Sequence, residues 1–530
     1  MQERGLSLGG NIRPLLLPLF AIVVFAAFSF LPDVRKHTVL APSFWSWSAF
    51  LLTWWIVLAV RVGRSKLPLE VEFVPRSPHY LQAVVQLTLF TYWGWHWRQV
   101  YENADLLLAQ VVFAYAFEML LSWSRRKKYF LGFGPLPIIF STNLFLWFRD
   151  DWFYLQFLMI GIGFLGKEFV RWNRDGKLTH IFNPSAFSLG LFSIVLILSD
   201  TTNLTWGPQI ATTLSLAPNI YLVIFLLGLV VMFAFRTTLV TATAAAALFA
   251  LSALYFQVVG VPYFIDSEIP IAVFLGLHLL VTDPSTSPRT PIGKAVFGFV
   301  YGIAVFALYE ILGNFGAPTF YDKLLCVPLL NLSVQVIDRL VKNWFQHDWV
   351  ERVGLQVAGS KSNAVHIVVW VAFFAAMTAI GSTDGIHRGD RVPFWQEACA
   401  EGSEKACSKL VHIESVFCGD GVGWACNELG VSFAEGMVTK RDPDLSQAYL
   451  QRSCQLGYWT GCVNIRGLSL GMREMRPGSL SRDVPSIHDL RALLREGGKN
   501  LLASPEAELL SRACDHGWTF ACSTDGTRYE

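Results

Sequence analysis

The sequence predicts an all-α protein: a polytopic bundle of transmembrane helices followed by a C-terminal helical repeat domain held by disulfides. Two observations predict this fold class. Of the 530 residues, 53% are hydrophobic and only 15% are charged, which is too apolar for an ordinary soluble protein of this length. Eight of the nine cysteines lie near the C-terminus as four equally spaced pairs. The formal net charge of +2 offers no basic field for binding nucleic acid.

Apolar segments, read at about 20 residues per span, predict thirteen membrane helices. The first follows a polar start and has no small-residue cleavage site after it, which favours a membrane anchor over a removed signal peptide. The expected spans are Pro14–Leu31, Trp45–Val62, His79–His96, Asp105–Trp123, Phe130–Trp147, Trp152–Phe164, Pro184–Leu198, Asn219–Phe235, Val240–Val259, Ile269–Thr282, Ile292–Leu312, Phe320–Ile337 and Ala364–Ile380.

Lysines and arginines gather in alternate loops between these spans, with Arg125–Lys128 and Lys167–Lys177 as the clearest clusters. Cytoplasmic loops of membrane proteins carry such an excess of positive charge. The clusters fall on one side if the N-terminus is cytoplasmic and the chain crosses thirteen times. An odd number of crossings places everything after Ile380 outside the cytoplasm.

Each cysteine pair has the form Cys-x-x-Gly-x-x-x-Ala/Gly-Cys. This spacing suits a helix hairpin in which the glycine ends the first helix in a left-handed conformation and the two sulfurs meet across the turn. The alternative is a cytosolic zinc module, but structural zinc sites mostly use cysteines two to four residues apart. Disulfides need an oxidising compartment, in agreement with an external tail. The expected bonds are Cys399–Cys407, Cys418–Cys426, Cys454–Cys462 and Cys514–Cys522.

The same tail resembles the cysteine-rich helical repeats of the Sel/TPR type. Cys418 and Cys454 are 36 residues apart, about one repeat of this class, and Asn427–Gly430 fits the second helix of a repeat. Helical repeats stack into concave surfaces that bind protein, so we expect the tail to dock a partner protein.

Three segments carry a second resemblance. They are His180–Pro184, Thr282–Lys294 and Asn331–Arg339, which read His-Ile-Phe-Asn-Pro, Thr-Asp-Pro-Ser-Thr-Ser-Pro with a downstream Gly-Lys, and Asn-Leu with a downstream Ile-Asp-Arg. In this order they resemble the membrane D subunit of the Rnf complex (RnfD) and the B subunit of the sodium-translocating NADH:quinone oxidoreductase (NqrB). The resemblance covers about residues 130–342.

The resemblance implies an inverted-repeat bundle that carries flavin, including FMN joined by a phosphoester to an external threonine. The family signature Ser-Gly-Ala-Thr is reduced here to Ala211-Thr212, so Thr212 is the positional match. Flavin held without a covalent bond is the alternative. The candidate residues for its phosphate or ring are Lys167, His180, Asn183, Asp283, Thr286, Arg289 and Lys294.

Plainer interpretations exist for several of these residues. Asn183 and Pro184 are typical of a helix start, with the asparagine as cap and the proline in the first turn. Arg289 and Lys294 also fit as topology signals. Glu118 and His278 are ionisable groups inside expected spans, and a hydrogen-bonded acid and a buried imidazole are the simpler readings of them. The sequence contains no Cys-x-x-Cys-His haem motif and no metal site.

The expected domains are an N-terminal four-helix extension at 1–128, the RnfD/NqrB-like core at 129–345, a cytoplasmic loop with the last span at 346–382, and the repeat domain at 390–530. The resemblance implies a subunit of a membrane redox complex in the bacterial inner membrane, with a periplasmic tail, lipid around it, other subunits as partners and quinone as a possible acceptor. A structural subunit that has lost flavin is the first alternative. A solute transporter is the second, but the sequence offers no broken-helix pair to support it.

Overall fold

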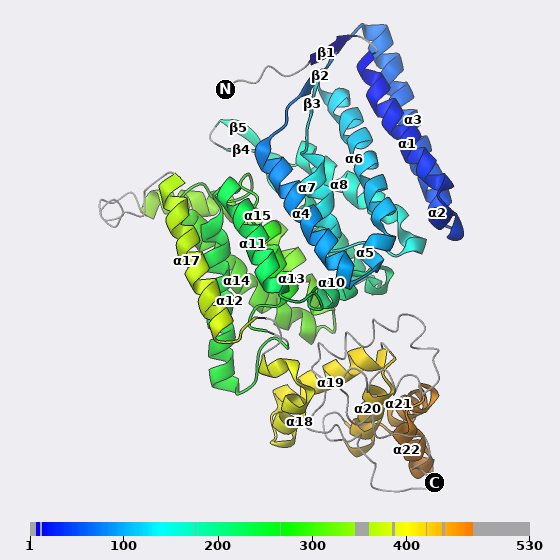
Figure 1. The fold of residues 1–530 in the computed structure, drawn as a ribbon, viewed down its shortest axis with the longest axis vertical. Helices are drawn as coiled ribbons and strands as arrows, with labels where there is room; N and C mark the ends of the chain where they lie inside the picture. Colours follow the sequence, from blue (N-terminus) through cyan, green and yellow to red (C-terminus); the bar gives the residue numbers. More distant parts are fainter. Residues whose placement is uncertain are drawn as a thin grey trace. The chain divides into compact units, whose positions relative to one another are not determined.

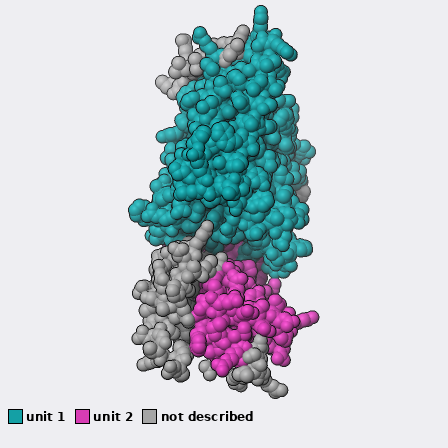
Figure 2. All heavy atoms as spheres, turned by 90° about the vertical axis from the view of Figure 1, so that its right-hand side faces the viewer, with its two compact units in different colours: residues 1–251, 271–376 teal, residues 252–270, 377–530 magenta. Residues whose placement is uncertain are grey.

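The computed structural model describes residues 7–10, 13–174, 176–265, 267–344, 360–383, 387–419, 421–436 and 440–469. The chain forms two compact units (Figures 1 and 2). Unit 1 comprises residues 1–251 and 271–376, and unit 2 comprises residues 252–270 and 377–530. Both units are mainly helical, which agrees with the expected fold class.

Six helical segments in the described part of the chain are long and apolar enough to cross a membrane, which identifies a membrane protein. They are Arg13–Phe30 (η1 Arg13–Leu15, α1 Leu16–Ala27 and η2 Phe28–Phe30), Leu40–Ser65 (α3), Ala104–Arg125 (α6), Thr238–Val259 (α12), Pro291–Asn314 (α14) and Thr319–Asn343 (η5 Thr319–Tyr321 and α15 Asp322–Trp344). The expected number of thirteen spans is not confirmed.

The other helices that begin in unit 1 are shorter or less apolar. They are α2 (Pro32–Lys36), α4 (Ser77–His96), α5 (Gln99–Glu102), α7 (Pro135–Asn143), η3 (Asp150–Trp152), α8 (Tyr154–Phe169), α9 (Pro184–Leu198), η4 (Thr202–Leu204), α10 (Gly207–Leu214), α11 (Ile220–Phe235), α13 (Ile271–Leu279) and α17 (Ser360–Ala379).

Two expected spans, Phe130–Trp147 and Ile269–Thr282, are wrong as full-length helices. Each contains only a nine-residue helix, α7 or α13, about 13 Å long, which is less than half the thickness of a hydrocarbon core. Every residue of α13 is buried, as is nearly every residue of α7. The chain therefore carries a pair of half-helices, and both are followed by non-helical backbone.

The end of α7 is held by buried amide groups rather than by continued helix. The Asn143 amide donates to Gln110 Oε1 at 2.7 Å, and its Oδ1 accepts from the Gln110 amide at 3.1 Å. Gln156 Oε1 accepts the backbone N–H of Phe148, just beyond the half-helix. These bonds satisfy polar groups that lipid cannot, so the helix can stop inside the bundle.

Short strands, which the all-α prediction did not include, join distant segments of unit 1. Strand β2 (Leu69–Phe73) pairs antiparallel with β1 (Ser7–Gly10) and parallel with β3 (Lys128–Leu131). A second hairpin consists of β4 (Arg171–Arg174) and β5 (Lys177–His180). Because β2 and β3 pair directly, the boundary expected at residue 128 does not separate compact units.

Unit 2 contains six short helices in the part of the chain that the structure describes. Its helices are η6 (Arg388–Asp390), α18 (Val392–Ala400), α19 (Glu404–Gly419), α20 (Gly423–Glu435), α21 (Pro443–Gln455) and α22 (Trp459–Ser469). Gly402, Gly421 and Gly457 have positive φ angles of 93°, 95° and 84°, as expected for glycines that end a helix in the left-handed conformation.

Three of the expected disulfides, Cys399–Cys407, Cys418–Cys426 and Cys454–Cys462, close the turns that follow α18, α19 and α21. The fourth expected bond, Cys514–Cys522, lies outside the described residues. The hairpin interpretation of the cysteine motif is therefore confirmed at three of its four occurrences.

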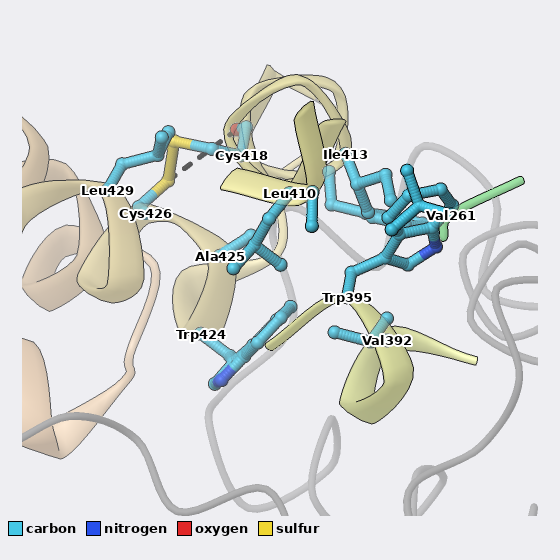
Figure 3. Packing of buried hydrophobic residues seen from close by; sticks show 12 residues of the cluster. Val261, Val392, Trp395, Leu410, Ile413, Cys418, Trp424, Ala425, Cys426 and Leu429 are labelled. Atoms are coloured by element: carbon cyan, nitrogen blue, oxygen red, sulfur yellow. Dashed lines mark hydrogen bonds between the residues drawn. A yellow bond between two sulfur atoms is a disulfide. The ribbon is translucent and has the colours of Figure 1, made fainter. Parts of the chain in front are cut away.

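The loop between α12 and α13 belongs to unit 2, which the sequence analysis did not foresee. Val261 packs in one buried cluster with Trp395, Leu410 and Ile413 (Figure 3). His387 Nε2 lies 3.4 Å from Glu268 Oε1, so an ion pair accompanies the apolar contact when the imidazole is protonated. The loop that leads into half-helix α13 is thus part of the core of unit 2.

A buried acid in unit 2 gives a testable pH dependence. Glu414 on α19 is 2% exposed, and burial, followed by the charge of Glu428, raises its pKa well above the ordinary value. The folded domain therefore keeps a proton that the unfolded chain releases. Stability is greatest below the unfolded pKa of about 4.3 and falls as the pH rises through the higher folded pKa.

We expect Glu414→Gln to stabilise α19 and α20 by about 1–3 kcal/mol at pH 8 and to flatten the pH profile, because the amide carries no charge. Hydrogen exchange of their amides in the full-length protein, corrected for intrinsic rates, measures the change. Glu404→Gln, an exposed position on the same helix, is the control. Equal pH profiles of stability for Glu414→Gln and Glu404→Gln would contradict the raised pKa of Glu414.

Candidate functional site

Residues from the three segments that carry the RnfD/NqrB resemblance meet in unit 1. The Asn183 side chain caps α9 by accepting the backbone N–H groups of Ser185 and Ala186, as expected. Its backbone N–H donates to Asn331 Oδ1 at 3.0 Å, and the Asn331 amide donates to the Thr286 carbonyl at 3.1 Å. One asparagine on α15 therefore ties the start of α9 to the loop between α13 and α14.

A buried ion pair makes a second tie between the same segments. Arg174, at the end of β4, lies 2.6 Å from Asp338 Oδ2 on α15, and the same guanidinium donates to the carbonyls of Ser285 and Ser287. Asp338 also accepts the backbone N–H of Arg289. Asp338 was expected as part of a motif, whereas Arg174 was expected only as a member of the basic Lys167–Lys177 loop.

A cavity of about 230 Å³ lies beside these ties. Four of the predicted residues, Lys167, His180, Asn183 and Asp283, line it, together with parts of α7 and the end of α13. Both half-helices thus contribute to the wall of the cavity. A wall of this kind, with a few charged groups among apolar side chains, is typical of small-molecule sites.

Asp283 and His180 face each other across this cavity, with His180 Nε2 at 3.6 Å from Asp283 Oδ2. Asp283 lies in the loop between α13 and α14. Burial alone would raise the pKa of Asp283, but the interaction with His180 and the hydrogen bonds from Ser285 outweigh it and lower that pKa to about 2. The cavity therefore presents a carboxylate at neutral pH.

Three other predicted residues do not line the cavity. Thr286 is buried and contributes its backbone carbonyl to Asn331. Arg289 is exposed, and its backbone N–H bonds to Asp338. Lys294 donates from Nζ to the Arg236 carbonyl at 2.7 Å, which fits the simpler interpretation of this residue as part of a basic loop.

Thr212 lies on α10, beyond the far end of α9 from the cavity. The expected loop is a helix there, and the Thr212 hydroxyl donates to the Gln209 carbonyl. Thr212 is partly exposed, whereas Thr213 is buried and accepts a hydrogen bond from the Trp93 indole at 3.1 Å. Of the two adjacent threonines, only Thr212 has a hydroxyl that is open to modification.

Aromatic side chains surround this second location. The Trp97 ring stacks on Trp147 with centroids 5.5 Å apart, and Trp147 stacks on Trp93 at 5.9 Å. The Arg149 guanidinium lies 4.5 Å from the ring centroid of Trp206. This group was not predictable from the sequence because its members come from three separate segments, at 93–97, 147–149 and 206.

A second cavity, of about 240 Å³, adjoins the first and shares with it Arg76, His79, Gly134 and Lys167. Glu118 lies in its wall. Its carboxylate lies 2.9 Å from Lys167 Nζ and accepts the Tyr129 hydroxyl at 3.1 Å, so Glu118 is hydrogen-bonded as the simpler interpretation expects. Arg76 and His79 were missed because Arg76 was read only as a basic loop residue and His79 only as the first residue of a span.

His278 is fully buried on α13, in agreement with the simpler reading. Its Nδ1 lies 2.7 Å from the Phe274 carbonyl, and it packs 5.8 Å from Trp370 between ring centroids. No cluster of three or more metal-ligating residues occurs within the described part of the chain. No known protein family, curated protein or solved structure matches this chain.

Proposed function

We propose that the chain is a membrane subunit of an electron-transport complex and that unit 1 binds flavin. One observation carries the proposal. The segments that suggest the RnfD/NqrB resemblance are more than 140 residues apart at their extremes, yet Asn183, Asn331 and Asp338 tie them together beside a single cavity. Basic residues that only set the topology do not have to lie close together in the folded protein, so the meeting of the three segments favours a binding role.

The chemistry of the cavity suits the polar edge of an isoalloxazine ring, which presents carbonyl oxygens and ring nitrogens. Lys167 and His180 can donate, and Asp283 can accept from a ring N–H. Ile138, Leu279 and other apolar side chains supply contact surface for the ring. A bound flavin would supply the one- and two-electron chemistry of the subunit.

A second flavin belongs to this proposal. FMN joined to Thr212 would lie at the other end of α9, where the tryptophans around Trp97 offer aromatic surface. Two flavins at the two ends of α9 would carry electrons across the membrane. Quinone is the acceptor class that such a subunit would serve.

The finer topology is also a proposal. Each half-helix, together with the non-helical backbone that follows it, is counted as one crossing. The thirteen crossings then leave the N-terminus in the cytoplasm and the repeat domain in the periplasm of a bacterial inner membrane. Three disulfides in unit 2 support an oxidising compartment for that domain. The repeats would dock another subunit of the complex.

The protein purified with its native partners is expected to release free flavin when it is denatured, measured by absorbance and fluorescence. Asp283→Ala should lower the flavin occupancy severalfold because it removes the charged acceptor of the cavity. Arg289→Ala, which changes a nearby residue that does not line the cavity, is the matched control. Equal flavin occupancy in both variants would contradict the proposal that flavin binds in this cavity.

The covalent arm of the same test uses the two adjacent threonines. Tryptic peptides that contain Thr212 should carry the added mass of FMN, and in-gel fluorescence should survive denaturation. Thr212→Val should abolish both signals, whereas Thr213→Val should keep them. Intact protein without flavin in either assay would favour the structural-subunit alternative.

A second candidate function, solute transport, gains support from one observation. The sequence offered no broken-helix pair, but α7 and α13 form one, and both contribute to the wall of the cavity. Paired discontinuous helices often surround the substrate site of transporters. Solute flux through proteoliposomes of flavin-free protein would favour this reading over electron transfer.

A further inference from the structure

The second cavity of unit 1 differs from the first in its charge. Its wall contains the basic side chains of Arg76, Lys167, Arg126 and Arg171, against only two acidic ones, Glu118 and Glu168. Aromatic side chains complete the wall. An excess of positive charge in a concave site attracts anions.

The partners of these groups show which donors are unused. Glu118 is paired with Lys167, and Glu168 is paired with Arg126 and Arg171. Arg76 and His79, by contrast, have no side-chain hydrogen bond or ion-pair partner among the residues that the structure describes. Both line both cavities. These two donors, Arg76 and His79, therefore lie on the wall that the two cavities share.

Backbone dipoles add to this charge. Helix α4 begins at Ser77, immediately after Arg76, and α7 begins at Pro135, next to Gly134 of the shared wall. A third helix, α9, begins at Pro184 in the wall of the first cavity. Each start carries the partial positive charge of its helix dipole, and at α9 the first N–H groups are capped by Asn183. Several such helix starts that point at one space favour a negatively charged occupant.

We propose that the shared wall of the two cavities is a phosphate-binding site, with Arg76 and His79 as the residues that hold the phosphate group. Arg76 supplies a planar donor pair that matches two phosphate oxygens, and His79 supplies a ring N–H. Lys167, already paired with Glu118, adds long-range attraction. The residues before 128, which carry no redox motif, thereby complete a binding site in unit 1.

The phosphate group could come from either of two molecules. A phosphorylated flavin in the first cavity, which rests on the proposed function, would place its phosphate here, whereas riboflavin would leave the site empty. An anionic phospholipid could instead place its headgroup between α4 and α7. Both sources share the chemistry of a phosphate ester.

The test measures how fast diethyl pyrocarbonate modifies His79 in the full-length protein, read by mass spectrometry of the His79 peptide. His96, at the other end of α4, is the internal reference. The probes are inorganic phosphate, FMN, riboflavin and nanodiscs with or without phosphatidylglycerol. Inorganic phosphate should slow the modification of His79 but not of His96.

Arg76→Gln should raise the phosphate concentration needed for protection about tenfold or more, since a hydrogen bond to a charged group is lost. Arg76→Lys should fall between Arg76→Gln and the wild type. Arg64→Gln, an exposed arginine of the same basic region that lines neither cavity, should behave like the wild type. Because Arg76 is exposed, its replacement should leave the fold intact.

Protection by FMN at a lower concentration than riboflavin supports the site with a cofactor as the source, and protection by phosphatidylglycerol alone supports it with a lipid as the source. If phosphate protects His79 in protein that binds no flavin, the phosphate site is supported and the flavin proposal is contradicted. Unchanged His79 rates with every phosphate probe, or equal effects of Arg76→Gln and Arg64→Gln, overturn the site, whether or not flavin binds.

Discussion

Replacing Arg174 with glutamine is expected to destabilise unit 1 by about 3 kcal/mol, the lower end of the range for breaking a buried ion pair. The guanidinium is 6% exposed and its partner Asp338 is 23% exposed. Glutamine cannot replace the ion pair and both bonds to the Ser285 and Ser287 carbonyls. The change would leave a half-buried carboxylate and two carbonyls without their donor, which explains the large cost.

Cys326 offers a direct measurement, because it is fully buried on α15 and is the one cysteine of the chain outside the repeat tail. Its labelling by a maleimide, followed by mass spectrometry across a denaturant series, reports the opening of unit 1. Arg171, on the same strand, is 28% exposed, and its partner Glu168 keeps Arg126 when Arg171 is lost. Arg171→Gln should therefore cost less than about 1 kcal/mol.

Two results would count against this account. Labelling curves that coincide for Arg174→Gln and the wild type would mean that the pair adds nothing to stability. Costs that add fully in the Arg174→Gln, Asp338→Asn double variant would mean that the two side chains act independently, since partners in one ion pair should be strongly non-additive.

The fold was predictable where a single physical rule decided it. The membrane character followed from composition, and the tail hairpins followed from the cysteine and glycine spacing around Gly402, Gly421 and Gly457. The half-helices were not predictable from hydropathy. The apolar sequence of α13 continues without a break to Val281, so hydropathy does not show where the helix ends. Only tertiary contacts, such as the amides around Asn143, end these helices inside the bundle.

The candidate site was predictable in part. The motif order pointed to Lys167, His180, Asn183 and Asp283, which line one cavity. Arg76 and His79 complete the site from a segment about 90 residues earlier in the chain. No local pattern could reveal them, because their role depends on how α4 packs beside α7 rather than on spacing along the chain.

Removing the Cys418–Cys426 disulfide by substituting both residues with alanine should destabilise unit 2 by about 3–5 kcal/mol. A loop of this length is worth about 2–3 kcal/mol through the entropy of the unfolded chain. The remaining cost comes from packing, because Cys418 is 2% exposed and Cys426 is fully buried in the cluster that contains Trp424 (Figure 3). Removing both sulfurs there creates a cavity that the surrounding side chains fill only in part.

The Cys399–Cys407 disulfide is the matched control, because it closes a loop of the same length at a half-buried turn. Substituting Cys399 and Cys407 with alanine should remove only the stabilisation that comes from loop closure in the unfolded chain. Hydrogen exchange of α19 and α20 amides in the full-length protein measures both variants. Equal losses of stability in the two variants would show that burial of the Cys418–Cys426 sulfurs adds nothing. A separate measurement blocks free thiols when the protein is taken from cells. Reduced thiols at all four positions would contradict an oxidising location for the tail.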